Sequence, residues 1–180
     1  RHGILLVADE VQSGMGRTGK LLAVEHSGVE PDIVCLAKGI ASGLPLGAFI
    51  ARAEQMSWPP GSHGSTFGGN PLACSAGLVT LDLLEEGLME NAARVGAQLL
   101  DGLREIAATH PQVTDVRGVG LMLAMEMKTA DQAAHLVQRS FERGLLLLTA
   151  GTRAVRLCPP LVLDREEAAT GLEIIASALG

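Results

Sequence analysis

A lysine and an aspartate, each directly after a short apolar run, are the residues of this sequence best suited to chemistry. Lys38 follows the apolar residues 33–37, and Asp9 follows the apolar residues 4–8. A lysine at a strand end that loses solvent can act as a nucleophilic amine. The alternative is that Lys38 only extends its charged end into water, as lysines at strand ends commonly do.

The two apolar runs must position these side chains. Both are apolar on both faces, which is typical of buried strands in a mostly parallel sheet. Ligands of such sheets bind in the crevice outside the carboxyl ends of the strands, so Asp9 and Lys38 share a crevice if their strands are neighbours. An acid and an amine placed in this way suit a cofactor with a basic ring nitrogen and an aldehyde. Pyridoxal phosphate is such a cofactor.

Two further segments carry groups that bind anions. Residues 64–69 offer hydroxyls and free amides that can cradle a phosphate, although an ordinary Gly/Ser loop has the same composition. Arg156 stands shortly before Pro159 and Pro160. Its planar fork matches a carboxylate, and the alternative for this residue is a salt bridge.

Five segments of the chain form a recognisable series. They are Asp9-Glu10-Val11-Gln12-Ser13-Gly14-Met15-Gly16-Arg17-Thr18-Gly19, Ala37-Lys38-Gly39, Gly47-Ala48, Gly64-Ser65-Thr66-Phe67-Gly68-Gly69-Asn70-Pro71 and Arg156-Leu157-Cys158-Pro159-Pro160-Leu161. Together they resemble the class III (omega-) aminotransferases, nearest to 4-aminobutyrate and acetylornithine aminotransferases and to related amino-acid racemases. Their order and spacing agree with that family along the whole chain, and no single motif carries the match.

The resemblance implies a role for each candidate residue. Lys38 forms the Schiff base with pyridoxal phosphate and later moves a proton, and Asp9 keeps the ring nitrogen protonated. Gln12 contacts the ring hydroxyl, although the sequence alone equally allows a loop amide that caps the backbone. Thr66 reaches the phosphate of the cofactor in the other subunit, and Arg156 binds the substrate carboxylate.

The activity implied is the transfer of an amino group from an amino acid to a 2-oxo acid such as 2-oxoglutarate. The donor would be an omega-amino acid such as 4-aminobutyrate, or acetylornithine, and the enzyme a homodimer or a dimer of dimers. The same residues would serve an amino-acid racemase, in which the proton returns to the substrate. A non-catalytic lobe of this fold is a third hypothesis, which the presence of both Lys38 and Asp9 disfavours.

The resemblance also implies the α/β fold of pyridoxal-phosphate-dependent transferases of fold type I. Residues 1–87 would be the C-terminal part of the cofactor-binding large domain, and residues 88–180 a small C-terminal α+β domain. On this interpretation the chain is the later part of a longer protein. The main phosphate-holding turn and the ring-stacking aromatic would precede it, so these residues alone are expected to be inactive.

Helix signals are clearest in the middle of the chain. Asn70 is expected to cap a helix that opens on Pro71 and ends near Gly87. A second helix starts at residue 88 or 89 and runs to His110, before a proline. The other expected elements are strands 48–51, 113–117, 120–127, 145–148 and 154–157 and helices 129–143 and 164–179.

Composition argues against several classes of function. The net charge is -6 without a clustered basic stripe, which disfavours a nucleic-acid partner, and no apolar run approaches the roughly 20 residues of a membrane span. The three cysteines lie far apart among apolar neighbours, which predicts reduced thiols and a cytoplasmic protein. The sequence contains no HExxH or CxxC motif that would indicate a metal site. The glycines after Asp9 do not open a helix, as a dinucleotide-binding motif requires, so we reject a dinucleotide site.

Overall fold

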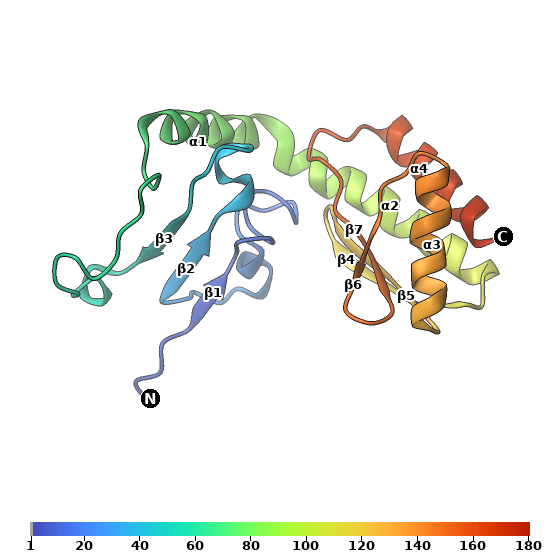
Figure 1. Ribbon diagram of the computed structural model, residues 1–180, viewed down its shortest axis with the longest axis horizontal. Helices are drawn as coiled ribbons and strands as arrows, with labels where there is room; N and C mark the ends of the chain where they lie inside the picture. Colours follow the sequence, from blue (N-terminus) through green and yellow to red (C-terminus); the bar gives the residue numbers. More distant parts are fainter. Residues whose placement is uncertain (1) are drawn as a thin grey trace. The chain divides into compact units, whose positions relative to one another are not determined.

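A three-stranded sheet carries the candidate residues in the first half of the chain (Figure 1). In the computed structural model, which describes residues 2–180, β1 (Val7–Asp9) runs parallel to β2 (Ile33–Leu36), and β2 runs antiparallel to β3 (Ala48–Ala51). β1 and β2 are thus neighbouring parallel strands, which is the condition under which Asp9 and Lys38 share one end of the sheet. The third strand is antiparallel because a short connection can return the chain only in that direction, whereas a parallel strand needs a longer crossover. Three short 3-10 helices flank the strands: η1 (Ala23–Ser27), η2 (Lys38–Ala41) and η3 (Ala53–Gln55).

The first strand begins later than the apolar run that predicts it. It covers Val7–Asp9 rather than residues 4–8, so Asp9 is its last residue. The carbonyl of Leu6 accepts irregular hydrogen bonds from the amides of Asp32 (2.9 Å) and Ile33 (3.1 Å), which shortens the regular ladder. The second strand ends at Leu36, one residue before the expected end.

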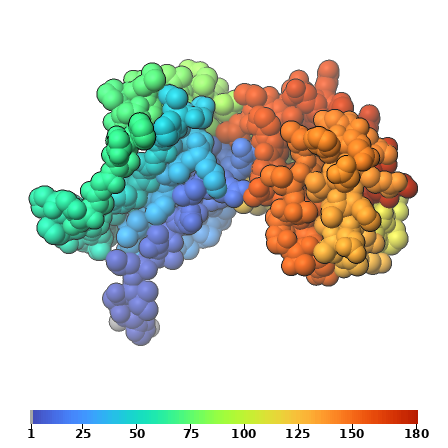
Figure 2. Space-filling view, viewed as in Figure 1, coloured from blue at the N-terminus to red at the C-terminus, as the bar shows by residue number. Residues whose placement is uncertain are grey.

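The strands of this sheet are not buried on both faces, so that expectation is wrong for the part of the chain described. Val7, Phe49 and Ile50 are 51%, 40% and 57% exposed. The first residues, dark blue in Figure 2, stand out as a narrow extension, and Ile4 is 82% exposed. Apolar composition predicted a covered sheet, but these side chains keep 40% or more of their surface exposed within residues 2–180, although the rings of Trp58 and His63 pack against Phe49.

The helix α1 (Pro71–Leu83) begins where its cap residue predicts. The side chain of Asn70 accepts a hydrogen bond from the amide of Ala73 (2.9 Å), and Pro71 occupies the first turn. A π-helical turn, η4 (Leu84–Leu88), follows and contains Gly87 with a φ of 140°, which an L side chain rarely adopts. The helix α2 (Met89–Thr109) comes next. The chain divides into two compact units, Arg1–Met89 and Glu90–Gly180.

The second unit packs helices on an antiparallel sheet of strand order β4-β5-β7-β6. Its core gathers buried side chains of α2 and of the sheet, among them Leu103, Leu123 and Met125. One strand is displaced from its expected position, because Leu147 turns into the core and the strand starts only at Leu148. The elements are β4 (Val113–Val119), β5 (Met122–Met127), α3 (Ala130–Glu142), β6 (Leu148–Ala150), β7 (Ala154–Leu157) and α4 (Arg165–Leu179).

Candidate active site

The parallel pairing of β1 and β2 brings Asp9 and Lys38 to the same end of one sheet. Asp9 pairs in register with Cys35, and Lys38 opens η2 one residue after the end of β2. Both side chains are exposed. One carboxylate oxygen of Asp9 accepts a hydrogen bond from the amide of Val11 (3.1 Å), which fixes the carboxylate at the strand end. A carboxylate and an amine therefore face solvent from adjacent strand ends.

Lys38 has an uncommon backbone conformation. Its φ is 51°, in the left-handed region, which costs a residue with a side chain roughly 1–2 kcal/mol. Ser42, at the other end of the same turn, has a φ of 48°. Within residues 2–180 the Lys38 amine has no hydrogen-bond or ion-pair partner. Strained residues of this kind persist where the surrounding structure holds them, and they concentrate at functional sites.

Glu10 lies next to Asp9 but has a different environment. It is 3% exposed, and its two carboxylate oxygens accept hydrogen bonds from the amide of Val24 (2.7 Å) and the hydroxyl of Ser13 (2.5 Å). The carboxylate of Glu10 thus ties the loop after β1 to η1. Sequence analysis assigned no role to Glu10, and the only available signal was the change of face between successive strand residues.

Gln12 follows Asp9 on the same loop. Its residue is half-buried, and its amide makes no hydrogen bond with another described residue. Within residues 2–180 the Gln12 amide therefore does not cap the backbone, which was the alternative interpretation of this residue. The position close after Asp9 leaves the Gln12 side chain available to a ligand at the strand ends.

Thr66 lies on the exposed loop before α1 and forms no hydrogen bond with Asp9 or Lys38. The neighbouring Ser65 hydroxyl accepts a hydrogen bond from the amide of Gly68 (3.0 Å), which shapes the loop. Within residues 2–180 the Thr66 hydroxyl has no protein partner.

Three rings hold the segment before this loop against β3. The ring centroids of Phe49 and Trp58 are 5.4 Å apart, and His63 packs edge-on against both at 6.2 Å and 5.6 Å. Such tilted and edge-to-face contacts are favourable for aromatic rings. The ring of His63 is therefore engaged in packing against Phe49 and Trp58.

Arg156 lies in β7 of the second unit, where it pairs with Ala124 on one side and Leu148 on the other. Its residue is half-buried, and its guanidinium has no hydrogen-bond or ion-pair partner within the part of the chain described. The nearby Arg153 is instead engaged, since it forms an ion pair with Glu126 (3.4 Å) and donates a hydrogen bond to the Lys128 carbonyl (3.3 Å).

A third arginine near this sheet is also engaged. Arg117 donates hydrogen bonds to Asp115 (2.7 Å) and Glu126 (3.0 Å), and these bonds raise the pKa of Arg117 above its ordinary value. Arg117 and Arg153 thus share the Glu126 carboxylate. Of these three arginines, only Arg156 lacks a partner among the described residues.

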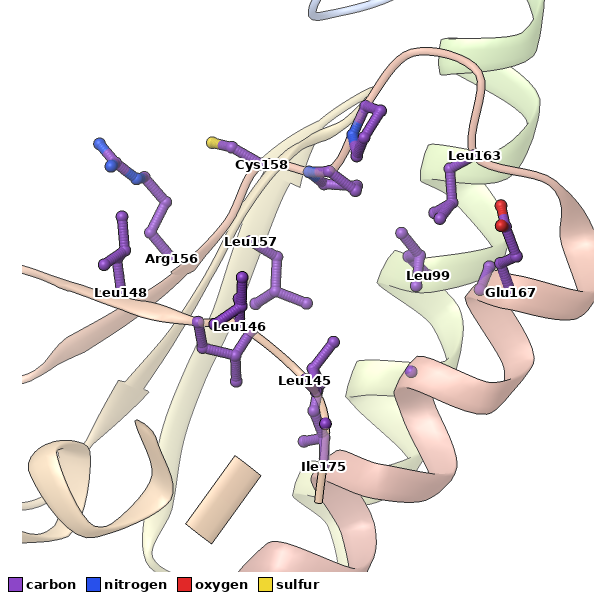
Figure 3. Close-up of a pocket in the computed structure, with 16 residues that line it drawn as sticks. Leu99, Leu145, Leu146, Leu148, Arg156, Leu157, Cys158, Leu163, Glu167 and Ile175 are labelled. Atoms are coloured by element: carbon purple, nitrogen blue, oxygen red, sulfur yellow. The ribbon is translucent and has the colours of Figure 1, made fainter. Parts of the chain in front are cut away.

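An apolar cavity of about 520 Å³ lies beside β7 in the second unit. Figure 3 shows Leu157 and Arg156 leaving the strand in opposite directions, with Leu157 among the apolar side chains around the hollow. Leu99 and Ile175 line the cavity from α2 and α4. Arg156 and Leu148 also line the cavity, and in the same view the guanidinium of Arg156 points away from Leu157.

Two classes of site are not found among residues 2–180. No group of three or more His, Cys, Asp or Glu side chains is placed to hold a metal ion. No helix of this part of the chain is long and apolar enough to cross a membrane.

Comparison with known proteins gives consistent matches. A family model described as "Aminotransferase class-III" matches residues 1–179. Acetylornithine aminotransferase of Streptococcus mutans is 48% identical over 97% of this chain and 46% of its own length. That of Synechocystis is 46% identical over 99% of this chain and 43% of its own length. The chain thus spans about half the length of these curated relatives.

Solved structures agree. Ornithine delta-aminotransferase of Plasmodium falciparum superposes with a TM-score of 0.91 at 39% identity, covering 99% of this chain and 47% of that one. Acetylornithine aminotransferase of Elizabethkingia anophelis superposes with a TM-score of 0.90 at 38% identity, covering 99% of this chain and 48% of that one.

Proposed function

Because this chain belongs to the class III aminotransferases, we propose that the natural full-length protein transfers an amino group from an amino acid to a 2-oxo acid. The enzymes of this family depend on pyridoxal phosphate, and their fold is that of fold type I. The observation that carries the proposal is the parallel pairing of β1 and β2, which sets the Asp9 carboxylate and the Lys38 amine at one end of a sheet.

The residues at these strand ends fit the cofactor. When bound, pyridoxal phosphate supplies an aldehyde that condenses with amines and a protonated ring that withdraws electrons. We assign the aldehyde end to the Lys38 amine and the ring nitrogen to Asp9, whose carboxylate holds the proton on that nitrogen. Gln12 is assigned to the ring hydroxyl, and the Thr66 hydroxyl to the phosphate in a second subunit of a homodimer. Each of these side chains has groups left over for a ligand.

Lys38 has a second task in this proposal. Once a substrate amine takes its place, the nitrogen Nζ of Lys38 is free to hold the proton that leaves the substrate carbon. The strained turn directs this amine from the strand end, and the side chain is exposed, so the amine can reach a substrate. The Asp9 carboxylate is assigned to balance the positive charge on the ring nitrogen.

Arg156 is assigned to the substrate carboxylate. It has no partner among the described residues, whereas Arg153 and Arg117 are held by Glu126, which supports this choice among the arginines. The relatives named above favour acetylornithine or ornithine as the amino donor over 4-aminobutyrate. We propose 2-oxoglutarate as the acceptor. The three free cysteines, Cys35, Cys74 and Cys158, support a reducing compartment such as the cytoplasm.

The test uses the natural full-length protein with pyridoxal phosphate, acetylornithine and 2-oxoglutarate. We expect glutamate to form, and borohydride reduction to leave the cofactor on a peptide that contains Lys38. The peptide with Lys20, an exposed lysine of the same unit, is the internal control. Loss of optical rotation of a single amino acid without an acceptor would indicate a racemase instead. Recovery of the cofactor on any peptide other than that of Lys38 would contradict the site.

A further inference from the structure

The turn that starts at Lys38 is packed against α1, an element with no assigned part in the reaction. Its last residue, Ala41, is 1% exposed. The buried residues of α1 are Ala73, Gly77 and Thr80, on the face that meets this turn. A Cβ added at Gly77 would lie 3.3 Å from the Ile40 carbonyl oxygen, so the helix approaches the backbone of the turn closely.

Two hydroxyls connect the turn to the helix. The hydroxyl of Thr80, a residue that is 8% exposed, donates to the Ala76 carbonyl at 2.8 Å. Because a hydroxyl has one proton, the 3.0 Å contact between Ser42 and Thr80 requires Ser42 to donate and Thr80 to accept. The bonds therefore run from Ser42 through Thr80 to the backbone of α1.

This connection holds the turn at the end opposite to Lys38. Ser42 has a φ of 48° and Lys38 a φ of 51°, so both ends of the turn are in a region that side chains disfavour. Backbone bonds inside the turn are long, at 3.2 Å from the Ile40 amide to the Ala37 carbonyl and 3.3 Å from the Ser42 amide to the Gly39 carbonyl. On the other side, a Cβ at Gly39 would meet Met15 at 3.6 Å. The bond from Ser42 to Thr80 adds an anchor from outside the turn to these internal bonds.

We infer that Thr80 is a positioning residue for the Lys38 amine, acting through Ser42. The inference rests on the proposed role of Lys38, and it adds a residue of α1 to the machinery that aims the amine. Without the Thr80 hydroxyl, Ser42 loses its acceptor, and the turn can relax toward right-handed φ values. The amine would then leave the strand end in a different direction.

The test compares Thr80→Val with Thr80→Ser in the natural full-length holoenzyme. Valine keeps the shape of threonine and removes the hydroxyl, whereas serine keeps the hydroxyl. Thr170→Val in α4 is the matched control, because Thr170 also donates to the carbonyl four residues back, that of Glu166 (3.0 Å), and has no second partner among the described residues. Ser42→Ala removes the other end of the connection and serves if Thr80→Val does not fold.

Two measurements are made on each variant. Amide hydrogen exchange reports on the turn directly, and for Thr80→Val we expect the amides of Ile40, Ser42 and Leu44 to exchange about threefold to tenfold faster, the effect of losing one hydrogen bond. We expect kcat to fall by a similar factor with KM for the amino donor nearly unchanged. Thr80→Ser and Thr170→Val should match the wild type in both measurements.

The outcomes separate this inference from the proposed function. If borohydride places the cofactor on Lys38 but Thr80→Val exchanges and turns over as the wild type does, the inference about Thr80 is wrong and the function stands. Faster exchange with unchanged kcat would show that Thr80 only stabilises the fold, which also overturns the inference. If the cofactor is recovered on another lysine, the proposed role of Lys38 is overturned, and the inference with it.

Discussion

At the scale of single residues, the two adjacent acids Asp9 and Glu10 show why a site is harder to predict than a strand. Both are carboxylates after the same apolar run, so composition cannot distinguish them. The structure separates them by environment, since Asp9 is exposed and Glu10 is 3% exposed with both oxygens engaged. The carboxylate of Glu10 is engaged by the amide of Val24, which lies 14 residues further along the chain. A short motif around Glu10 contains no information about that partner.

We therefore expect opposite defects from matched substitutions. Asp9→Asn should lower kcat by about 100-fold or more, because the ring nitrogen loses its carboxylate, while thermal stability stays close to that of the wild type. Glu10→Gln should keep most of kcat and lose about 1–3 kcal/mol of unfolding free energy, because the neutral amide leaves buried donors poorly paired. Steady-state kinetics and urea unfolding measure the two effects. Equal loss of activity in the two variants would contradict the assignment.

Arg156 gives a second prediction at this scale. Arg156→Lys should raise KM for carboxylate substrates by about 10- to 100-fold, because lysine cannot offer two parallel hydrogen bonds. Reaction with a simple amine that lacks a carboxylate should change little. Arg153→Lys is the control, since Arg153 is already paired with Glu126. If both substrate types lost the same factor in Arg156→Lys, Arg156 would be structural.

At the scale of elements, signals that act locally were the most informative. The cap at Asn70, the proline at 71 and the glycine at 87 predicted the start of α1 and the break before α2. The strand at β6 was misplaced because Leu145–Leu148 is a run of identical residues with no alternation to set its register. The direction of β3 was also missed, since the composition of a strand does not encode its direction.

Close packing between elements yields a prediction on stability. A Cβ added at Gly96 of α2 would lie 2.2 Å from the Gly120 carbonyl oxygen, whereas one at Gly171 of α4 would meet nothing within 4 Å. Gly171→Ala should therefore stabilise by about 0.5–1 kcal/mol through helix propensity. Gly96→Ala should destabilise by several-fold more than that, about 2–4 kcal/mol, because backbone must move. Thermal unfolding of the two variants measures both changes in stability. A stabilising Gly96→Ala would show that the turn at Gly120 yields easily.

At the scale of the whole molecule, the family and the fold class were predicted from the order of motifs along the chain, and both are confirmed. What was not predicted is the exposure of the first sheet. The apolar surface of Ile4, Val7 and Ile50 lies open, although its composition is that of a covered sheet. The composition of a strand indicates which surroundings suit it, and it does not indicate which residues provide those surroundings.

The 180-residue chain by itself should therefore fail to transaminate and should self-associate. In the proposed site Asp9 and Lys38 would hold only two ends of the cofactor, and exposed strands with apolar side chains invite association. A titration with pyridoxal phosphate followed by an assay for glutamate tests activity, and sedimentation velocity tests association. Val7→Lys should reduce association, while Val162→Lys, at a 69% exposed site in the second unit, should not. Robust turnover by the isolated chain would refute this expectation.

The left-handed backbone of Lys38 lowers the stability of the fold at the residue whose amine serves the proposed reaction. A φ of 51° suits glycine, so Lys38→Gly should be at least as stable as the wild type while it loses the amine. Lys38→Ala should keep the backbone strain and also lose the amine. Selection for fold alone would then remove the lysine. Under the proposed role of Lys38, a descendant of this protein that no longer carries out the reaction would be expected to drift to glycine or asparagine at this position.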